Sequence, residues 1–141
     1  LGLPEYLLRR LRLVQNAAAR DLFNLSLRTH MFSHLKALHW LQIKKRILFK
    51  ALVLVHKAIH DKGAIYLRNR IHAYVPARNL RSAHGHLAKV PSFRLVRSGG
   101  KSFSCLGPRA WNYLLLNLRE ITELPTFRKQ LKTWLFSQAL E

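Results

Sequence analysis

The chain has 141 residues, with 25 Lys or Arg against 6 Asp or Glu, so its formal net charge is +19. Because 49% of the residues are hydrophobic, we expect one packed domain rather than a disordered chain. The single cysteine, Cys105, excludes an internal disulfide and a cysteine-rich zinc module. The two aspartates, Asp21 and Asp61, lie far apart in the sequence, which argues against a polymerase, nuclease or kinase that holds metal ions with clustered carboxylates.

The ends and apolar runs of the sequence carry no membrane or secretion signal. The longest central apolar run, Ala51–Val55, is far shorter than the ~20 residues that a membrane span needs. The first residues, LGLPEYLLRR, do not follow a signal-peptide pattern. Since the sole methionine is Met31, we expect the chain to be a piece of a longer reading frame.

The first predicted element is a helix from Pro4-Glu5 to about Leu22, because proline and an acid favour a helix start. Apolar residues recur along it at helical spacing and predict one buried stripe, made of Leu7, Leu11, Val14, Ala18 and Leu22. The opposite face carries Arg9, Arg12, Asn16 and Arg20.

Three more helices are predicted before residue 76. Thr29 is a candidate cap for a helix over 30–40, and the apolar spacing predicts a long helix over 43–60 with Gly63 as its C-terminal stop. A shorter helix over 65–73 follows.

Residues 76–102 contain prolines, serines and a Gly-Gly pair, which favour loops. Two short runs, 86–90 and 93–97, are compatible with a β-hairpin. Helices are predicted again over 110–118 and 125–139, the last with a buried side formed by Phe127, Leu131, Trp134 and Leu135. The predicted fold is therefore mainly α, with about five to six helices and a small irregular or β-hairpin insertion.

Histidines and the cysteine give no strong catalytic or metal-binding pattern. His30 and His34, and also His56 and His60, are four residues apart, the spacing of a two-histidine metal clamp on a helix. No Glu follows either first histidine, so the metalloprotease pattern is absent. We predict no metal, no cofactor, no catalytic residue and no small-molecule substrate, and we expect Cys105 to be a buried small side chain.

The distribution of charge predicts a polyanionic partner. Between Lys62 and Arg119 there are eleven Lys or Arg and no acid, whereas a surface selected only for solubility mixes both signs. Arginine forks match phosphate geometry, and aromatic faces stack on unpaired bases. The predicted nucleic-acid contacts are Arg9, Arg12, Arg46, Lys50, Arg78, Arg81, Arg94, Arg97, Lys101 and Arg109.

An ordered set of short segments resembles a known family. The segments are Val14–Arg20 (VQNAAAR), Leu38–Leu41 (LHWL), Arg81-Ser82 after Pro76, Val90-Pro91, Phe103–Asn112 (FSCLGPRAWN) and Phe127–Phe136 (FRKQLKTWLF). In this order they resemble the C-terminal region of LINE-type, non-LTR retrotransposon reverse transcriptases of the jockey-like branch. The resemblance covers essentially the whole chain.

The resemblance implies a non-catalytic segment of an RNA-directed DNA polymerase whose aspartates lie upstream of this region. It implies a helical thumb-like part over 1–75, a basic insertion over 76–106 and a C-terminal helical part over 107–141, all in one compact unit. The implied partners are template RNA, target DNA and the upstream polymerase domains. The implied location is the nucleus or a cytoplasmic ribonucleoprotein.

The sequence also departs from the family pattern. Proline is usual in the family at the positions of Ser33, Gln42, Ala64 and Leu115, and an acid is usual at Gly100. Since prolines fix turns and helix starts, we expect looser helix boundaries at these places. The departures leave a decayed retrotransposon copy as an alternative. A structural segment that packs on the parent polymerase and a cationic binder of anionic membranes are further alternatives.

Overall fold

The structure is a computed structural model that describes residues 2–76, 85–92, 100 and 102–138. In these residues the chain is mainly α-helical, as predicted. The seven helices are α1 (Glu5–Phe23), α2 (Phe32–Ala37), α3 (Ile43–Ile59), α4 (Ile65–Arg68), α5 (Phe103–Asn112), α6 (Leu116–Arg119) and α7 (Leu124–Ser137).

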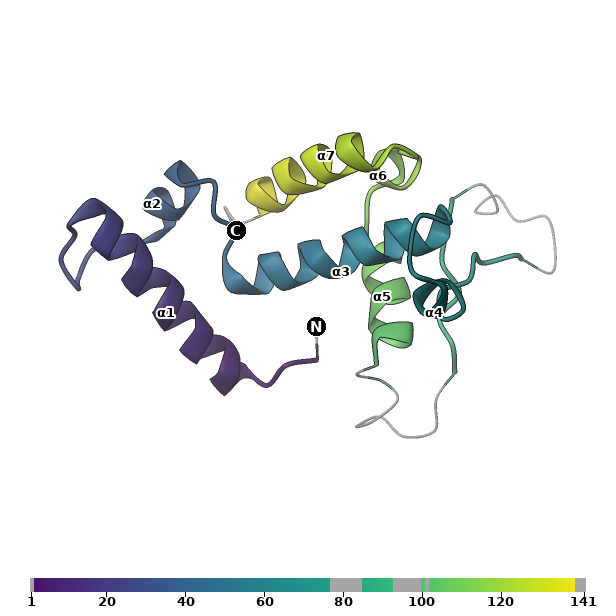
Figure 1. The fold of residues 1–141 in the computed structure, drawn as a ribbon, viewed down its shortest axis with the longest axis horizontal. Helices are drawn as coiled ribbons and strands as arrows, with labels where there is room; N and C mark the ends of the chain where they lie inside the picture. Colours follow the sequence, from purple (N-terminus) through teal and green to yellow (C-terminus); the bar gives the residue numbers. More distant parts are fainter. Residues whose placement is uncertain (1, 77–84, 93–99, 101, 139–141) are drawn as a thin grey trace.

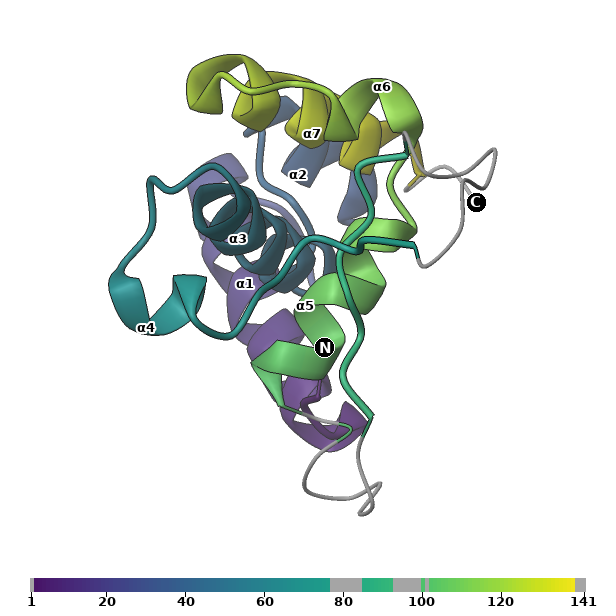
Figure 2. The same cartoon turned by 90° about the vertical axis from the view of Figure 1, so that its right-hand side faces the viewer.

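Helix α3 lies at the centre of the molecule and packs against α1, α4, α5 and α7 (Figures 1 and 2). Its side chains Leu52 and Val55 are fully buried, because neighbouring helices lie on several sides of α3. The predicted buried side of the last helix is confirmed for Phe127, Leu131 and Leu135 of α7, which are fully buried. The fourth predicted residue, Trp134, is only half-buried and packs against the edge of this core. Burial of each such large apolar side chain contributes about 1.5–3 kcal/mol.

His56 is buried among aromatic rings in this core. Its ring stacks on Phe127 with centroids 4.2 Å apart and lies 4.3 Å from the His60 ring. Its Nε2 lies 2.8 Å from the carbonyl oxygen of Ile121, so the proton must sit on Nε2, which donates. Burial lowers the pKa of His56 to about 4, so the imidazole is neutral at pH 7. Trp111 is also fully buried in this core.

Several helix ends differ from the predicted ones. The helix predicted over 110–118 is wrong: α5 begins at Phe103 and ends at Asn112, and a separate short helix, α6, follows from Leu116. Helix α2 begins at Phe32 with no side-chain cap, and the Thr29 hydroxyl lies 3.1 Å from the Ser26 hydroxyl instead. After α3 the left-handed residue is Asp61 (φ 55°), not Gly63. Helix α4 ends at Arg68, well before Ala73.

The predicted buried face of α1 is wrong. Leu11, Val14 and Leu22 are 45–69% exposed, whereas Gln15 and Ala19 are buried. The face of α1 that is buried is the one that carries Gln15, whose Nε2 donates to the carbonyl oxygen of Leu41 at 2.8 Å. Ala19 packs with Met31 and Leu35 in a second, smaller core cluster.

Side chains of α5 and α6 hold residues 85–88 in place by hydrogen bonds to their backbone. Asn112 of α5 accepts from the N–H of Ala88 at 2.8 Å and donates to its carbonyl at 3.0 Å, as a strand neighbour would. Trp111 donates to the carbonyl of His86 at 2.8 Å, and Arg119 donates to that of Gly85. Ala88 forms an antiparallel bridge with Ala73, while the predicted hairpin pairs 86–90 with 93–97. The second of these runs lies outside the described residues.

Candidate nucleic-acid interface

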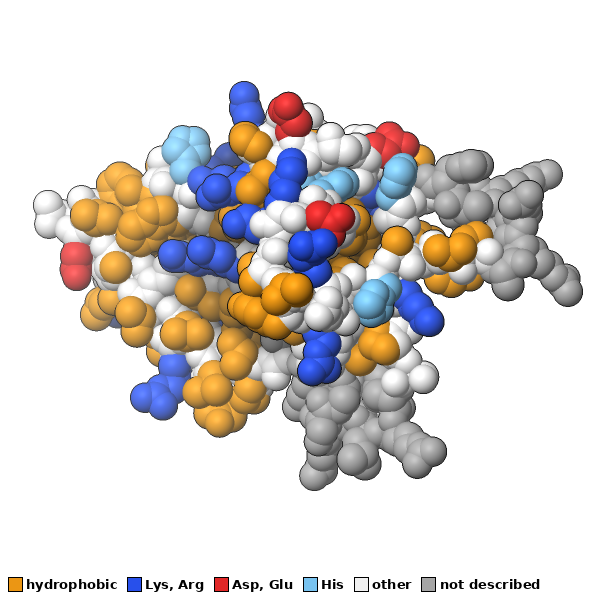
Figure 3. Space-filling model, turned by 45° about the vertical axis from the view of Figure 1, so that its right-hand side comes forward, with side chains coloured by type: hydrophobic (Ala, Val, Ile, Leu, Met, Phe, Trp, Pro, Cys, Tyr) orange, Lys and Arg blue, Asp and Glu red, His pale blue; other side chains and the backbone are white. Residues whose placement is uncertain are grey.

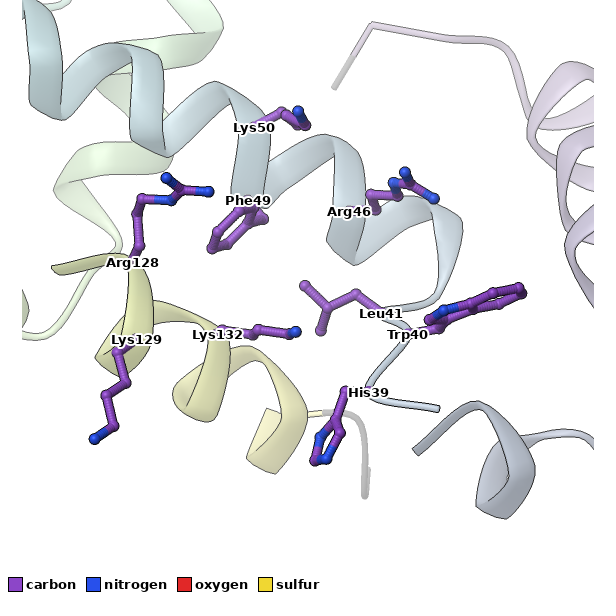
Figure 4. A pocket seen from close by; sticks show the side chains of 9 residues that line it. All are labelled: His39, Trp40, Leu41, Arg46, Phe49, Lys50, Arg128, Lys129 and Lys132. Carbon is purple, nitrogen blue, oxygen red and sulfur yellow. The ribbon is translucent and has the colours of Figure 1, made fainter. Parts of the chain in front are cut away.

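An open groove of about 440 Å³ lies between α3, α7 and the connection of α2 to α3 (Figure 4). Its lining residues are His39, Trp40, Leu41, Arg46, Phe49, Lys50, Arg128, Lys129 and Lys132. Five of these nine residues are Lys or Arg, and none is acidic.

Helical spacing places the cations along the groove. Arg46 and Lys50 are one turn apart on α3, and Arg128 and Lys132 are one turn apart on α7, so each pair lies on one face of its helix. In Figure 4, Arg128 points from α7 towards α3 and Lys132 points towards Leu41. Arg46 and Lys50 extend from α3 away from α7, and Lys129 points away from α3. The two helices pack against each other through the core, and this packing fixes the distance between the two cationic rows.

Aromatic side chains lie among these cations. Phe49 points from α3 towards α7, and Trp40 extends beyond the start of α3 (Figure 4). Both are half-buried, so part of each ring reaches solvent. His39 has a left-handed backbone (φ 53°), which reverses the chain after α2. Below them Leu41 is buried in the main core and gives the groove a rigid floor.

Among the described residues no carboxylate pairs with the cations of the groove. In the described part of the chain the ion pairs are Lys44 with Glu5 at 2.9 Å and Arg68 with Asp61 at 2.6 Å. Neither involves a groove residue. Figure 3 shows Lys and Arg side chains spread over one face of the molecule, with few carboxylates among them. Such an unbalanced surface attracts anions at long range.

This arrangement suits the backbone of a nucleic acid. Two guanidinium groups and three ammonium groups offer donors to successive phosphates, and the half-buried rings offer faces on which unpaired bases stack. The site has no nucleophile paired with a base, so the chemistry it supports is binding.

The structure brings together two of the predicted contact residues, Arg46 and Lys50. Arg9 and Arg12 are exposed on α1, and Arg109 is exposed on α5; none of the three lines the groove. The remaining predicted contacts lie outside the described residues: Arg78, Arg81, Arg94, Arg97 and Lys101.

Sequence reasoning missed the contribution of α7. Arg128, Lys129 and Lys132 of this helix are not among the predicted nucleic-acid contacts, and neither are His39 and Phe49. The available signal was their spacing, which repeats that of Arg46 and Lys50. What the spacing does not contain is the packing of α7 beside α3.

The histidines and Cys105 are the other residues for which the sequence raised a chemical role. The described residues contain no group of three or more His, Cys, Asp or Glu that could hold a metal ion. Cys105 is buried as predicted, with its Sγ 3.9 Å from the carbonyl oxygen of Pro91. Within the described residues, no helix has the length and apolar character required to cross a bilayer.

Comparison with known proteins gives no relative. No family model, no curated protein and no solved structure matches this chain.

Proposed function

We propose that this chain is a non-catalytic nucleic-acid-binding segment of an RNA-directed DNA polymerase, and that the groove between α3 and α7 holds the nucleic acid. The observation that best supports this proposal is the groove itself, which is lined by five cations and two aromatic rings and by no acid. The identity of the parent enzyme is supported only by the resemblance of the ordered segments described above. Catalysis by the parent would depend on carboxylates elsewhere in the longer protein.

Recognition in this groove is expected to be tolerant of sequence. Contacts to phosphates position a strand and read no bases, and every base offers a face for stacking. A single strand fits the arrangement best, because Trp40 and Phe49 can stack only on bases that are not enclosed in a duplex. RNA and single-stranded DNA are both accepted on this account.

A pair of charge-matched variants tests the proposal. The groove variant Arg128→Gln/Lys132→Gln removes two groove cations, and the control variant Arg10→Gln/Arg70→Gln removes two exposed cations that lie outside every described pocket. At 0.1 M salt each lost contact to a single strand costs a factor of ~5, so the groove variant should bind about 25-fold more weakly. Fluorescence anisotropy with a labelled single-stranded RNA measures this. Equal weakening by both variants would mean that the groove is not the site.

A structural role in the parent polymerase is favoured by a different observation. Helix α1 leaves Leu11, Val14 and Leu22 between 45 and 69% exposed on one face, and such an apolar stripe is typical of a covered surface. On this account the chain self-associates when it is alone. Size-exclusion chromatography of wild type against Leu11→Gln/Val14→Gln tests it: the variant should be monodisperse where the wild type is not. A monodisperse wild type would rule this role out.

A further inference from the structure

We propose that residues 72–75 bind an extended acidic segment of a partner protein as an added β-strand, and that one aliphatic side chain of this segment enters the pocket beside α4. The pocket has a volume of about 370 Å³ and lies where α4 packs beside the end of α3 (Figure 1). It shares no lining residue with the groove between α3 and α7. This surface is therefore separate from the nucleic-acid site proposed above.

The backbone of Ala73 has an unpaired side. Ala73 and Ala88 face each other in the antiparallel bridge, and the two hydrogen bonds that frame the bridge join the flanking residues over 2.8 Å. In such a pair the N–H and C=O groups of the two central residues point away from each other. Both outward groups of Ala88 bond to the side chain of Asn112. In the part of the chain that the structure describes, neither group of Ala73 has a partner.

This open edge suits a peptide strand. Ala73 is exposed, and an unpaired N–H and C=O at the edge of an extended segment are a template for a further strand. One residue of an antiparallel strand placed there accepts from the N–H of Ala73 and donates to its carbonyl. Phosphate groups offer acceptors only, so they leave that carbonyl without a donor. The edge therefore recognises a peptide, and the side chains of the peptide supply the specificity.

One face of the edge is apolar. Side chains alternate along an extended segment, so Ala73 shares a face with Ile71 and Val75. Ile71 is buried and forms the floor of the pocket, while Ile65 is 71% exposed and forms a wall. The peptide residue opposite Ala73 lies on this same face. An aliphatic side chain at that position enters the pocket and covers Ile65.

The other face is basic. His72 and Lys89 lie opposite each other across the bridge, so they share a face, and both are exposed. The exposed Arg70 comes just before them. Asp61, the acid that lines the pocket, is already paired with Arg68 at 2.6 Å. Acidic side chains on either side of the aliphatic residue therefore meet charges of opposite sign, and the fitting segment alternates acidic and aliphatic residues.

Fluorescence anisotropy with the whole chain tests the assignment. The probe is fluorescein-Glu-Val-Glu-Val-Glu-amide, and the control peptide, fluorescein-Val-Val-Glu-Glu-Glu-amide, has the same composition and charge without the alternation. We expect the alternating peptide to bind about 10-fold more tightly than the control. Methylation of both valine nitrogens removes the donors to the edge and should weaken binding about 10-fold. Methylation of the central glutamate nitrogen, whose N–H points away from the edge, should leave binding nearly unchanged.

A matched pair of variants locates the peptide on the protein. Ile65→Gln changes a wall of the pocket, and Val14→Gln changes a similarly exposed side chain on α1; the two side chains are 71% and 69% exposed. Because the peptide covers apolar surface only at Ile65, Ile65→Gln should weaken binding about 10-fold. Val14→Gln and the groove variant should leave it unchanged.

Four results would overturn the proposal. The first is no binding at millimolar peptide, and the second is equal binding of the control peptide, which would mean that charge alone holds the probe. The third is equal weakening by Ile65→Gln and Val14→Gln. The fourth is loss of peptide binding in the groove variant, which would place the peptide in the groove. Failure of RNA binding with peptide binding retained would contradict only the function proposed above.

Discussion

Three helices begin after an exposed residue whose backbone already has the conformation of proline. The φ and ψ angles are −55° and 150° at Gln42, −60° and 143° at Ala64, and −59° and 147° at Leu115. The pyrrolidine ring holds φ at about −65 ± 15°. None of the three N–H groups donates a hydrogen bond within the described residues, so proline would remove no bond.

Replacement of all three residues by proline is therefore expected to stabilise the chain. Each substitution restricts the unfolded chain at a compatible site and contributes about 0.4–1 kcal/mol. The triple variant should be more stable by about 1–3 kcal/mol, and each single variant should raise Tm by about 1–4 °C. These positions are three of the four at which the family that the sequence resembles usually has proline.

Urea denaturation followed by circular dichroism measures the change. The matched control is Asn69→Pro: its φ of −66° also suits proline, but its N–H donates to the carbonyl of Ile65 at 3.0 Å. Loss of that bond and the clash with that carbonyl should destabilise the control by about 3 kcal/mol. A triple variant no more stable than the wild type would refute the reasoning from backbone geometry.

Three further predictions concern the core. Because the pKa of His56 is about 4 in the folded chain against 6.5 for the ordinary side chain, the unfolded state binds the proton first as pH falls. The contribution of His56 to the free energy of unfolding is therefore full well above pH 6.5 and is lost as the pH falls, by about 2–3 kcal/mol at pH 4.5. Urea denaturation at neutral pH and at pH 4.5 should show this difference, and His56→Gln should make the free energy of unfolding less dependent on pH. Gly107→Ala places a Cβ 2.9 Å from Val55 Cγ2, so it should cost about 1–3 kcal/mol; in a double-mutant cycle with Val55→Ala, an additive result would contradict the clash. Asn112→Ala removes both bonds to Ala88 and should cost about 1–3 kcal/mol in thermal unfolding, whereas an unchanged Tm would mean that those bonds contribute nothing.

The central and last helices are well predicted because local signals agree with the tertiary packing. Pro125 lies in the first turn of α7, and the spacing of Phe127, Leu131 and Leu135 gives the side that the core buries. In α3 the apolar arc likewise faces neighbouring helices. Periodicity identifies a buried face wherever one stripe is clearly the most apolar.

The orientation of α1 could not be predicted because the helix has two candidate stripes. The more apolar one, with Leu11 and Val14, stays exposed, while the buried one contains the polar Gln15. The hydrogen bond from Gln15 to Leu41 joins residues 26 positions apart. Pattern reasoning contains no information about such a partner.

Only the α3 side of the candidate site could be predicted from the sequence. Arg46 and Lys50 follow from helical spacing on one element, whereas the groove exists only because α7 packs beside α3.

The salt dependence of binding tests the central claim most directly. For single strands, log K falls against log salt with a slope of about −0.7 for each neutralised phosphate. Anisotropy titrations of a labelled single-stranded RNA between low and high salt should give a groove-variant slope shallower than that of the wild type by about 1.4. The control variant should keep the wild-type slope. If the groove variant also keeps the wild-type slope, Arg128 and Lys132 contact no phosphate, and the groove between α3 and α7 is not the nucleic-acid interface.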